Sequence, residues 1–491
     1  MVLRQAFNFD NSFARELGGL YVDWKVAGAP RPSLVALNKG LADELGLAAD
    51  ELASPEGVAV LAGASAPPGA EPLAQAYAGH QFGGFVDQLG DGRALLLGEV
   101  IGRDGRRRDI QLKGSGRTPF SRNGDGKAAL GPVLREYMIA EAMHALSIPP
   151  TRALAAVTTG EVVRRETELP GAVLTRVADS HIRVGTFQFF AVRGDVARLR
   201  RLADYSIARH YPHVIGTADP YLKLFGAVLE RQAELIARWM HVGFVHGGMY
   251  TDNMAISGET IDYGPCAFLD TYDPGAVFSS IDARGRYAFA NQPAIAQWNL
   301  ARFAETLIPL MGDGTDAAIR RLTGVLETFP DLFQHHWLTG MRLKLGLSTA
   351  RDGDLELANG LLVIMAANGL DYCKTLRGLS GLAGGGNCGG AAADDPTTLG
   401  AWLKTWTVRC ELESLDPRQR AQPMDAVNPV YIPRNHKVEE ALAAAVDEGN
   451  YGPFERMNDV LARPFDVQPD AEPYAEGPPP GSPTHMTYCG T

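Results

Sequence analysis

The 491-residue sequence has few cysteines and lacks both a long apolar run and an excess of positive charge. Its five cysteines show neither CxxC spacing nor the density of a disulfide-stabilised secreted fold, so we expect most of them to be reduced thiols. No window approaches the ~18 consecutive apolar residues of a membrane helix. The N-terminal segment lacks an apolar stretch followed by small residues, the mark of a signal peptide. We therefore expect a cytoplasmic protein without a membrane partner.

The charge balance argues against a nucleic-acid partner. The formal net charge is -11, whereas nucleic-acid binding requires a concentrated basic surface. Hydrophobic residues make up 45% of the chain and charged residues 21%, as in ordinary globular proteins with a sizeable core. The length suits about three domain-sized units. We expect a strand-rich N-terminal unit over residues 1–160, a second unit over 161–345, a helical region over 346–465 and a flexible, Cys-containing tail over 466–491.

Short strand-like segments alternate with turn residues in the first unit. The segments cover residues 85–89, 93–101 and 107–113. The Gly90-Asp91-Gly92 sequence between the first two is a strong hairpin signal. In the third segment the apolar side chains alternate with polar ones, so Lys113 points away from the hydrophobic face. The pattern predicts three consecutive antiparallel strands.

A helix is predicted to begin near Pro132, because proline is tolerated in a first turn. Apolar residues then recur at helical spacing, and Glu136 lies on the same stripe. Burying an unpaired carboxylate is costly, so Lys113 is the candidate partner. Three strands, a lysine and a helix glutamate form the layout of the N-terminal lobe of a protein kinase. The alternative is an unrelated β-meander with a surface lysine and glutamate.

A second hairpin is predicted over residues 172–190, with Asp179-Ser180 as its two-residue turn. This register places Arg176 opposite Arg183, and like charges directly opposite destabilise a sheet. A polyphosphate between the two guanidinium groups would remove the repulsion. The alternative is a pair of solvated arginines on a flexible loop.

Residues 246–264 read HGGMYTDNMAISGETIDYG. Protein kinases place a catalytic Asp two residues after a His, an Asn five residues beyond that Asp, and then a metal-binding Asp-Phe-Gly. Here His246 and Asn253 keep that spacing, and Asp262 begins an Asp-Tyr-Gly sequence. Gly248 stands where the catalytic Asp would be.

The oxygen-bearing side chains of this loop suit a nucleotide-bound metal ion. Asn253 and Asp262 are hard donors, and Mg²⁺ takes only one or two protein ligands when it also binds phosphate. Gly248 cannot accept a proton. Asp252, immediately before Asn253, is a candidate to orient or deprotonate an incoming hydroxyl group. The alternative role of Asp252 is to stabilise the loop.

Several long strings in the chain resemble the selenoprotein O family, whose bacterial members include the YdiU-type proteins. The strings are FDNSFAREL, YAGHQFGGFVDQLGDGRALLLGE, DIQLKGSGRTPFSRNGDGKAALG, the helix containing REY, HGGMYTDNM and TIDYGP. The resemblance covers nearly the full length. It implies an α+β, protein-kinase-like bilobal fold in which ATP binds in a flipped orientation. AMP would then be transferred, with Mg²⁺ or Mn²⁺, to Ser, Thr or Tyr hydroxyls of protein substrates. Separately from the resemblance, we expect a monomer.

The resemblance also implies roles for particular residues. Lys113, paired with Glu136, would hold the phosphates together with Arg176 and Arg183. The nucleotide site would be lined by Gly90, Gly92, Arg93, Asp125 and Gly126. Asn253 and Asp262 would bind the metal ion, and Asp252 would accept the proton. We also expect Lys127 to join Lys113, Arg176 and Arg183 in stabilising the departing pyrophosphate.

The loop after His246 departs from the usual family pattern, and the C-terminal cysteine is interpreted through that pattern. Gly248 and Tyr250 stand where family members more often carry Val and Asn, so contacts to the substrate near Tyr250 are in doubt. Cys489 is third from the C-terminus, where eukaryotic relatives carry selenocysteine. The resemblance supports a redox disulfide between Cys266 and Cys489. The alternative is a buried Cys266 with a free thiol in the tail.

Three functions remain open from the sequence. The first is transfer of AMP to proteins, with Asp252 as proton acceptor. The second is phosphate transfer by an atypical kinase in which Asp252 replaces the missing acid. The third is a pseudokinase that binds nucleotide and serves only as a scaffold, although such a protein need not retain Lys113, Glu136, Asn253 and Asp262 together.

Overall fold

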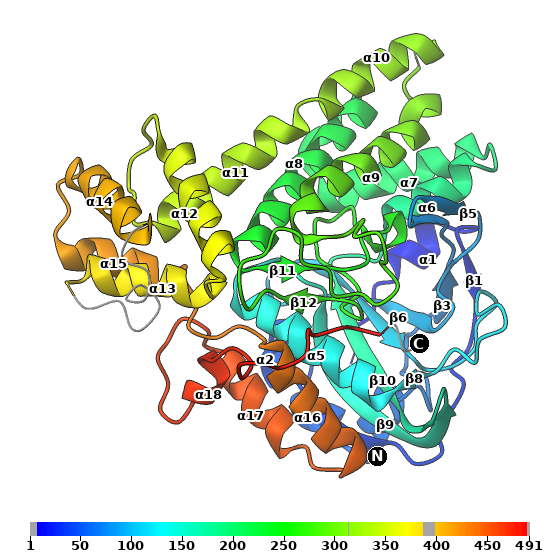
Figure 1. Ribbon diagram of the computed structural model, residues 1–491. Coiled ribbons are helices and arrows are strands. Elements are labelled where there is room, and N and C mark those ends of the chain that lie inside the picture. Colours follow the sequence, from blue (N-terminus) through cyan, green and yellow to red (C-terminus); the bar gives the residue numbers. More distant parts are fainter. Residues whose placement is uncertain (1–6, 313, 386–397, 489–491) are drawn as a thin grey trace.

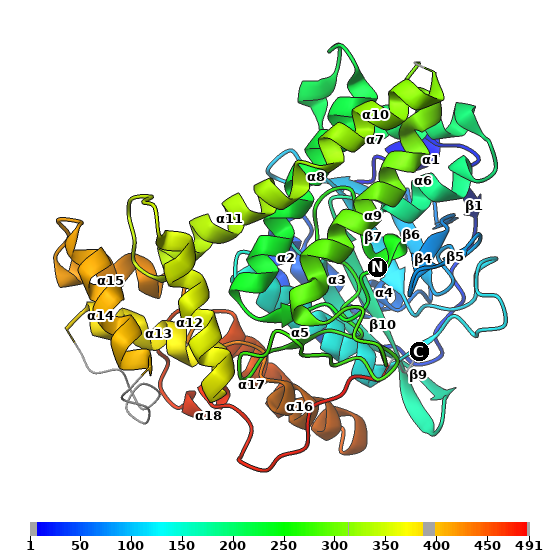
Figure 2. The same ribbon diagram turned by 45° about the horizontal axis from the view of Figure 1, so that its top comes forward.

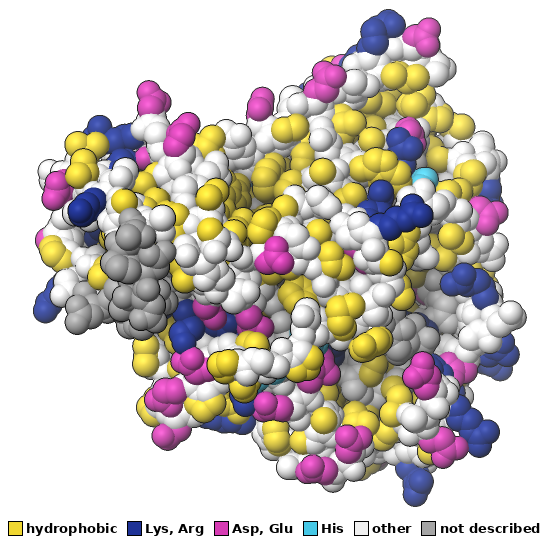
Figure 3. Space-filling view, viewed as in Figure 1, with side chains coloured by type: hydrophobic (Ala, Val, Ile, Leu, Met, Phe, Trp, Pro, Cys, Tyr) yellow, Lys and Arg dark blue, Asp and Glu magenta, His cyan; other side chains and the backbone are white. Residues whose placement is uncertain are grey.

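The computed structural model describes residues 7–312, 314–385 and 398–488. These residues form a mixed α/β protein in which an antiparallel sheet is followed in the chain by many helices (Figure 1). In the part of the chain that is described, no helix is long and apolar enough to cross a membrane. On the face drawn in Figure 3, acidic and basic side chains are interspersed and do not gather into one basic patch.

The main sheet has eight strands in the order β1-β3-β6-β7-β10-β9-β2, with β8 paired to β10. The strands are β1 (Tyr21–Asp23), β2 (Ser33–Leu37), β3 (Leu73–Gln75), β6 (Ala94–Ile101), β7 (Arg107–Lys113), β8 (Ala128–Ala129), β9 (Arg152–Arg164) and β10 (Glu168–Ala178). All of their pairings are antiparallel. Residue 160, the expected end of the first unit, lies inside β9.

The predicted meander is correct for two of its three strands. β6 and β7 pair as expected, with Leu95 opposite Leu112. The prediction for residues 85–89 is wrong: β5 (Gly84–Val86) pairs with β4 (Gly79–Gln81) in a separate two-stranded sheet. The neighbour of β6 on that side is β3, which comes from earlier in the chain. A turn signal at Gly90 did not reveal this non-local pairing.

The two faces of the sheet have different partners. Ile110 and Leu112 belong to a hydrophobic cluster with α2 (Lys39–Glu44), α3 (Ala49–Leu52) and α4 (Pro55–Leu61). Because side chains alternate along a strand, Lys113 lies on the opposite face, as predicted. The helix α5 (Leu130–Ala145) covers that face, beginning two residues before the expected start.

The predicted hairpin over residues 172–190 is wrong. Only its first half is a strand, β10, which pairs with β7 and β9. The chain then leaves the sheet and enters α6 (Val184–Ala191). The intervening His181 is buried and binds the Asp109 carboxylate through both its backbone N–H and its ring Nδ1, at 2.9 Å each. These contacts hold the chain where it leaves the end of β10.

The following part of the chain is mainly helical (Figure 1). Its helices are α7 (Val196–His210), α8 (Pro220–His241), α9 (Gln292–Leu307), α10 (Thr315–Leu326) and α11 (Phe329–Lys344). The long helix α8 confirms the predicted periodicity and leads into the short strand β11 (Phe244–Val245), which pairs with β12 (Ala267–Phe268). This pair brackets the loop that begins at His246.

A further group of helices projects to one side, drawn in yellow and orange in Figures 1 and 2. It comprises α12 (Asp354–Asn368), α13 (Tyr372–Ala383), α14 (Thr398–Glu411) and α15 (Pro417–Asp425).

The chain then returns to α5. α16 (Asn435–Asp447) and α17 (Gly452–Leu461) pack against α5. The Arg135 and Glu439 side chains form an ion pair at 2.9 Å, and the rings of Tyr137 and Phe454 lie 5.8 Å apart.

Residues 466–488, for which the composition predicted a mobile tail, make specific contacts. The segment includes the short helix α18 (Glu472–Ala475), whose last carbonyl accepts a hydrogen bond from Arg434 at 2.8 Å. Thr487 pairs with Ser279 in a parallel bridge, and its hydroxyl group donates to the Pro265 carbonyl at 2.9 Å. The tail therefore returns to the loop that follows Asp262.

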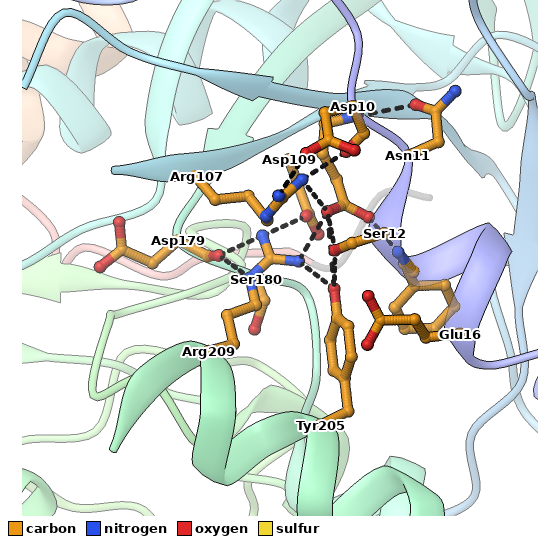
Figure 4. Close-up of polar contacts among 12 residues, drawn as sticks. Asp10, Asn11, Ser12, Glu16, Arg107, Asp109, Asp179, Ser180, Tyr205 and Arg209 are labelled. Atoms are coloured by element: carbon orange, nitrogen blue, oxygen red, sulfur yellow. Dashed lines mark hydrogen bonds and ion pairs between the residues drawn. The ribbon is translucent and has the colours of Figure 1, made fainter. Parts of the chain in front are cut away.

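A buried polar network joins the sheet to the helical part (Figure 4). Arg209 of α7 forms ion pairs with Asp109 of β7 at 2.6 Å and with Glu99 of β6 at 3.3 Å. Glu99 also accepts a hydrogen bond from the Ser12 hydroxyl at 2.6 Å. Ser12 and Tyr205 are joined by a 2.6 Å hydrogen bond. Because a buried charge without partners is costly, this network fixes α7 against the two strands.

Candidate active site

A cavity of about 1090 Å³ lies between the sheet, the loop after β11 and the tail. It is lined by most of the predicted site residues, namely Gly90, Gly92, Arg93, Lys113, Asp125, Gly126, Lys127, Arg176, Arg183, Asp252, Asn253 and Asp262. Met486, Thr487 and Tyr488 of the tail also line it. The structure thus brings together residues from six separate parts of the sequence.

Lys113 lies at the centre of the buried charges in this cavity. Its ammonium group forms an ion pair with Glu136 of α5 and a second one, at 2.8 Å, with the Asp262 carboxylate. The lysine ends β7, where the side-chain alternation directs it away from the apolar face. One side chain therefore joins the sheet, α5 and the loop that carries the Asp-Tyr-Gly sequence.

Arg176 and Arg183 do not face each other across two strands, yet both reach the cavity. Arg176 binds Glu136 at 3.2 Å and donates to the Gln111 side chain at 2.6 Å. Arg183 lies over the Tyr77 ring at 4.3 Å and is 3.6 Å from the Asp91 carboxylate. The Nε of Arg183 is buried without a hydrogen-bond partner among the described residues.

Asp91 is a site residue that the sequence reasoning did not single out. Its side chain is only 1% exposed and accepts hydrogen bonds from the Gln75 N–H at 3.1 Å and the Gln111 amide at 3.3 Å. Burial raises the pKa of Asp91 to about 6, although the nearby Arg183 opposes this change. Gly90 precedes it at φ +77°, and a Cβ there would lie 2.3 Å from the Phe120 ring. The Gly-Asp-Gly sequence was the available signal, but it was interpreted only as a turn.

The ring of His246 supports the loop and is buried. Its Nε2 hydrogen-bonds the Ile261 carbonyl at 2.9 Å, and the ring stacks on Trp239 with centroids 5.3 Å apart. The Gly248 N–H donates to its Nδ1 at 3.2 Å. Burial lowers the pKa of His246, so the ring is neutral at pH 7. His246 therefore orients the loop and does not line the cavity.

Asn253 and Asp262 lie close enough to bind one ion together. The Asn253 amide nitrogen is 3.3 Å from the second oxygen of Asp262 and donates to the Gly248 carbonyl at 3.0 Å. Asp262 has φ +69°, an uncommon backbone conformation for a residue other than glycine. Burial favours the neutral acid, but the Lys113 ammonium and then Arg93 hold the pKa of Asp262 well below its ordinary value. Asp262 is therefore ionised at pH 7 and presents carboxylate oxygens to the cavity.

The chemistry of this donor pair fits Mg²⁺ or Mn²⁺ when phosphate supplies further ligands. The described residues contain no group of three or more His, Cys, Asp or Glu that could hold a metal ion without other ligands. A carboxylate and an amide side chain are the small set of protein ligands that Mg²⁺ takes beside phosphate and water. The amide of Asn253 would have to turn its oxygen toward the ion.

Asp252 is buried beside this pair. One carboxylate oxygen accepts a hydrogen bond from the Gln81 amide at 3.0 Å, and the other has no hydrogen-bond partner among the described residues. Burial raises the pKa of Asp252 to about 6, against the opposing effect of the Gln81 hydrogen bond. Gln81 was not predicted as a site residue, although it lies within the string YAGHQFGGF.

Asp125 and Lys127 lie on the cavity wall in ion pairs of their own. Asp125 pairs with Arg165 at 2.9 Å, and Lys127 pairs with Glu161. The Lys127 ammonium is thus bound to a carboxylate of β9 and does not share the carboxylates that bind Lys113 and Arg176. All four cations of the expected cluster line the cavity, but Lys127 is paired with a carboxylate of its own.

Cys266 lies two residues beyond the Asp-Tyr-Gly sequence and is buried. Its thiol donates to the Tyr263 carbonyl at 3.1 Å, and burial raises the pKa of the thiol to about 12. Thr487 binds the carbonyl of the neighbouring Pro265. Cys489 lies outside the described residues, so the structure does not define the distance between the two sulfur atoms.

Comparison with known proteins identifies relatives along the whole chain. Residues 4–462 match the family described as Protein adenylyltransferase SelO. A Protein nucleotidyltransferase YdiU from Rhizobium leguminosarum bv. trifolii is 56% identical over 99% of this chain and 98% of its own length. Proteins with the same name from Cereibacter sphaeroides and Methylorubrum extorquens are each 57% identical; both alignments cover 99% of this chain, and they cover 100% and 99% of those proteins.

The environment of Asp91 predicts a pH-dependent contribution to stability. Its folded pKa of about 6 is above the ordinary aspartate value of 3.8, so the folded state binds the proton more tightly than the unfolded state. The free energy of unfolding therefore falls as pH rises from about 4 to 6. Between pH 5 and 7, the wild-type protein should lose about 1 kcal/mol relative to Asp91→Asn. Urea unfolding of both proteins at the two pH values measures this difference.

The exposed Asp87 provides the matched control for this comparison. The stability difference between Asp87→Asn and wild type should be the same at both pH values. If the stability difference between Asp91→Asn and wild type is also the same at both pH values, Asp91 does not titrate in this range in the folded protein.

Proposed function

This chain belongs to the SelO family of protein adenylyltransferases, and we propose that it transfers AMP from ATP to Ser, Thr or Tyr hydroxyl groups of other proteins. Membership of the family makes the protein a nucleotidyltransferase. The geometry of the cavity supports the more specific proposal, which concerns the direction of ATP, the acceptor group and the proton acceptor.

The proposed fold is a two-lobed arrangement like that of protein kinases. The eight-stranded sheet and α5 would be the first lobe, and the helices from α6 to α11 would be the second. The ion pair between Lys113 and Glu136, and the Asp-Tyr-Gly sequence facing it, support this correspondence. We place the boundary between the lobes after β10, because that strand completes the sheet.

The observation that carries the proposal is the state of Arg183. Its side chain is buried, its Nε lacks a hydrogen-bond partner among the described residues, and the nearest carboxylate is 3.6 Å away. Its terminal nitrogens contact the Asp91 carboxylate and, at 3.3 Å, the Asp252 backbone carbonyl, so the Nε is the donor that remains available to a bound anion. Arg176 beside it is 4% exposed. We infer that the terminal phosphates of ATP bind at Arg176 and Arg183. The triphosphate would then enter the cavity ahead of the adenosine, and the α phosphorus would lie within reach of Asp252.

Asp252 would then act on the acceptor hydroxyl group. Its carboxylate takes the hydroxyl proton as the oxygen attacks the α phosphorus, and the bond from the α phosphorus to the bridging oxygen of pyrophosphate breaks. AMP remains on the protein acceptor and pyrophosphate leaves. Lys113, Arg176 and Arg183 would stabilise the charge that develops on pyrophosphate. Gly248, two residues after His246, offers no acid at the position that kinases use.

Asn253 and Asp262 would hold Mg²⁺ or Mn²⁺. When bound, such an ion neutralises phosphate charge and aligns the triphosphate. The Asp262 side chain is ionised before any metal ion binds, because Lys113 and Arg93 favour its carboxylate form.

Phosphate transfer is the second candidate function. It is supported by the same Lys113, Glu136 and Asp262 arrangement, which in kinases serves transfer of the γ-phosphoryl group. A scaffold without activity is less consistent with the family, because its described members are transferases.

The position of the radiolabel in ATP distinguishes these functions. We expect ATP labelled at the α phosphorus to transfer label to proteins of a dialysed bacterial extract, and ATP labelled at the γ phosphorus to transfer none. Incorporation of label only from the γ phosphorus would contradict the proposal and favour a kinase. Absence of transfer from either position would favour a scaffold.

The Asp262→Asn variant tests the metal assignment. Removing one charged ligand should lower the initial rate of label transfer by about a hundredfold or more, because Mg²⁺ organises the triphosphate. Thermal unfolding provides an independent measurement: Mg²⁺ with a non-hydrolysable ATP analogue should raise the Tm of the wild-type protein more than that of the variant. Asp273→Asn, at an exposed position outside the cavity, is the matched control. An unchanged rate in Asp262→Asn would refute the assignment.

We further propose that a disulfide between Cys266 and Cys489 regulates access to the cavity. The proposal is supported by Thr487, which binds the carbonyl of the residue before Cys266 and lies two residues before Cys489. The buried Cys266 thiol has a pKa of about 12, so the tail thiol would react first with a low-molecular-weight disulfide. Exchange with Cys266 would then release the second small thiol and close the protein disulfide.

Reduction should therefore raise the activity of protein that has been oxidised with a low-molecular-weight disulfide, because the tail would no longer be tethered at the cavity. Cys266→Ser and Cys489→Ser should be insensitive to this cycle, whereas Cys410→Ser should respond as wild type does, since Cys410 lies on α14. Rates of label transfer before and after reduction test this. If reduction leaves the wild-type rate unchanged, the regulatory proposal is wrong.

A further inference from the structure

The hairpin formed by β4 and β5 has an unusual turn. Gln81 pairs with Gly84, so Phe82 and Gly83 form a two-residue connection, and both have positive φ, at +52° and +82°. Such turns strongly prefer Asn-Gly, because a bulky residue at positive φ is strained. Strain of this kind persists only where the surrounding structure imposes it.

Contacts with two tyrosines hold the strained turn in place. The Phe82 N–H donates to the Tyr287 hydroxyl at 2.9 Å. The Phe82 ring centroid lies 5.4 Å from that of Tyr250 and 5.3 Å from that of Tyr287. Tyr250 is two residues before Asp252 in the sequence. The tip of the hairpin is therefore fixed beside the loop that carries Asp252.

A closed set of hydrogen bonds fixes the first strand of the hairpin to the same loop. The His80 N–H donates to the Thr251 hydroxyl at 2.7 Å, and that hydroxyl donates to the Gln188 side-chain oxygen at 2.6 Å. The Gln188 amide in turn donates to the His80 ring Nδ1 at 2.8 Å. Thr251, the neighbour of Asp252, is thus held by β4 and by α6.

The hairpin contacts both oxygens of the Asp252 carboxylate. Gly79 packs so closely that a Cβ there would lie 2.3 Å from one oxygen, and only glycine leaves this space. The Gln81 amide donates to the other oxygen at 3.0 Å. Among the described residues, Gln81 is the only side chain with a hydrogen bond to that carboxylate.

We propose that Gln81 is a positioning residue that fixes the plane of the Asp252 carboxylate for its reaction with the acceptor hydroxyl group. This inference rests on the proposed function, in which Asp252 accepts the hydroxyl proton. The terminal torsion of an aspartate has a broad energy minimum, so the carboxylate turns unless a partner holds it. Because proton transfer depends on geometry, loss of the Gln81 amide lowers the rate of the chemical step and leaves the binding of ATP intact.

Two substitutions separate the hydrogen bond from the shape of the side chain. Gln81→Met keeps the length without a donor, and Gln81→Glu keeps the shape with an acceptor in place of the donor. Both should lower the initial rate at saturating ATP about tenfold or more, with dialysed bacterial extract as acceptor and ATP labelled at the α phosphorus. The apparent KM for ATP and the affinity for a non-hydrolysable analogue with Mg²⁺ should change less than about twofold. Gln297→Met, on α9 with its amide directed to the Leu326 carbonyl, should behave as wild type.

The outcomes distinguish failure of this inference from failure of the proposed function. Asp252→Asn is measured in parallel. If Asp252→Asn keeps the wild-type rate, the proposed function itself is wrong. If Asp252→Asn is impaired but either Gln81 variant keeps the wild-type rate, the positioning role is wrong. The positioning role is also wrong if the fall in rate of a Gln81 variant is matched by an equal loss of affinity for the ATP analogue or of folded protein. Gln81 would then maintain the structure of the site and not the orientation of Asp252 alone.

Discussion

The site depends on one buried ammonium group held between two carboxylates. Lys113 lies between Glu136 and Asp262, and each of the three side chains comes from a different element: a strand, a helix and a loop. Removing Lys113 would leave the Asp262 carboxylate without an ion-pair partner among the described residues, and removing either carboxylate would leave the buried ammonium group with one partner in place of two, which is unfavourable. This requirement fixes α5 relative to the sheet, and it fixes the Asp-Tyr-Gly sequence relative to both. The positions of Arg176 and Asn253 follow, because each binds one of the two carboxylates.

The features that the sequence predicted correctly were those with local patterns. The alternation in β7 placed Lys113 on the face away from the apolar core, and the helical spacing around Glu136 placed its carboxylate inward. The spacing from His246 to Asp262 predicted which side chains line the cavity. The errors concern non-local partners. A turn signal at Gly90 does not reveal that β3 is the neighbour of β6, and Asp179-Ser180 does not reveal that His181 is drawn to Asp109.

The residues around Asp252 were the hardest to predict, for a related reason. Gln81 lies about 170 positions earlier in the chain, and no periodicity connects a short hairpin to a distant loop. The Phe82-Gly83 turn also lacks the Asn or Asp that usually precedes the glycine of a two-residue hairpin. In the folded protein, this hairpin binds the Asp252 side chain, and the hairpin and α6 together hold the neighbouring Thr251. Asp252 and the cations Lys113 and Arg176 are thus held by different parts of the chain.

The packing of α16 and α17 against α5 limits how α5 can move. In the linear sequence they come some three hundred residues after α5, yet they cover its outer side through Arg135 and Tyr137. A helix enclosed by the sheet on one side and by these helices on the other has no open space into which it could swing. Switching by outward rotation of this helix would require the C-terminal segment to detach first. α16 and α17 therefore brace the helix that carries Glu136, the partner of Lys113.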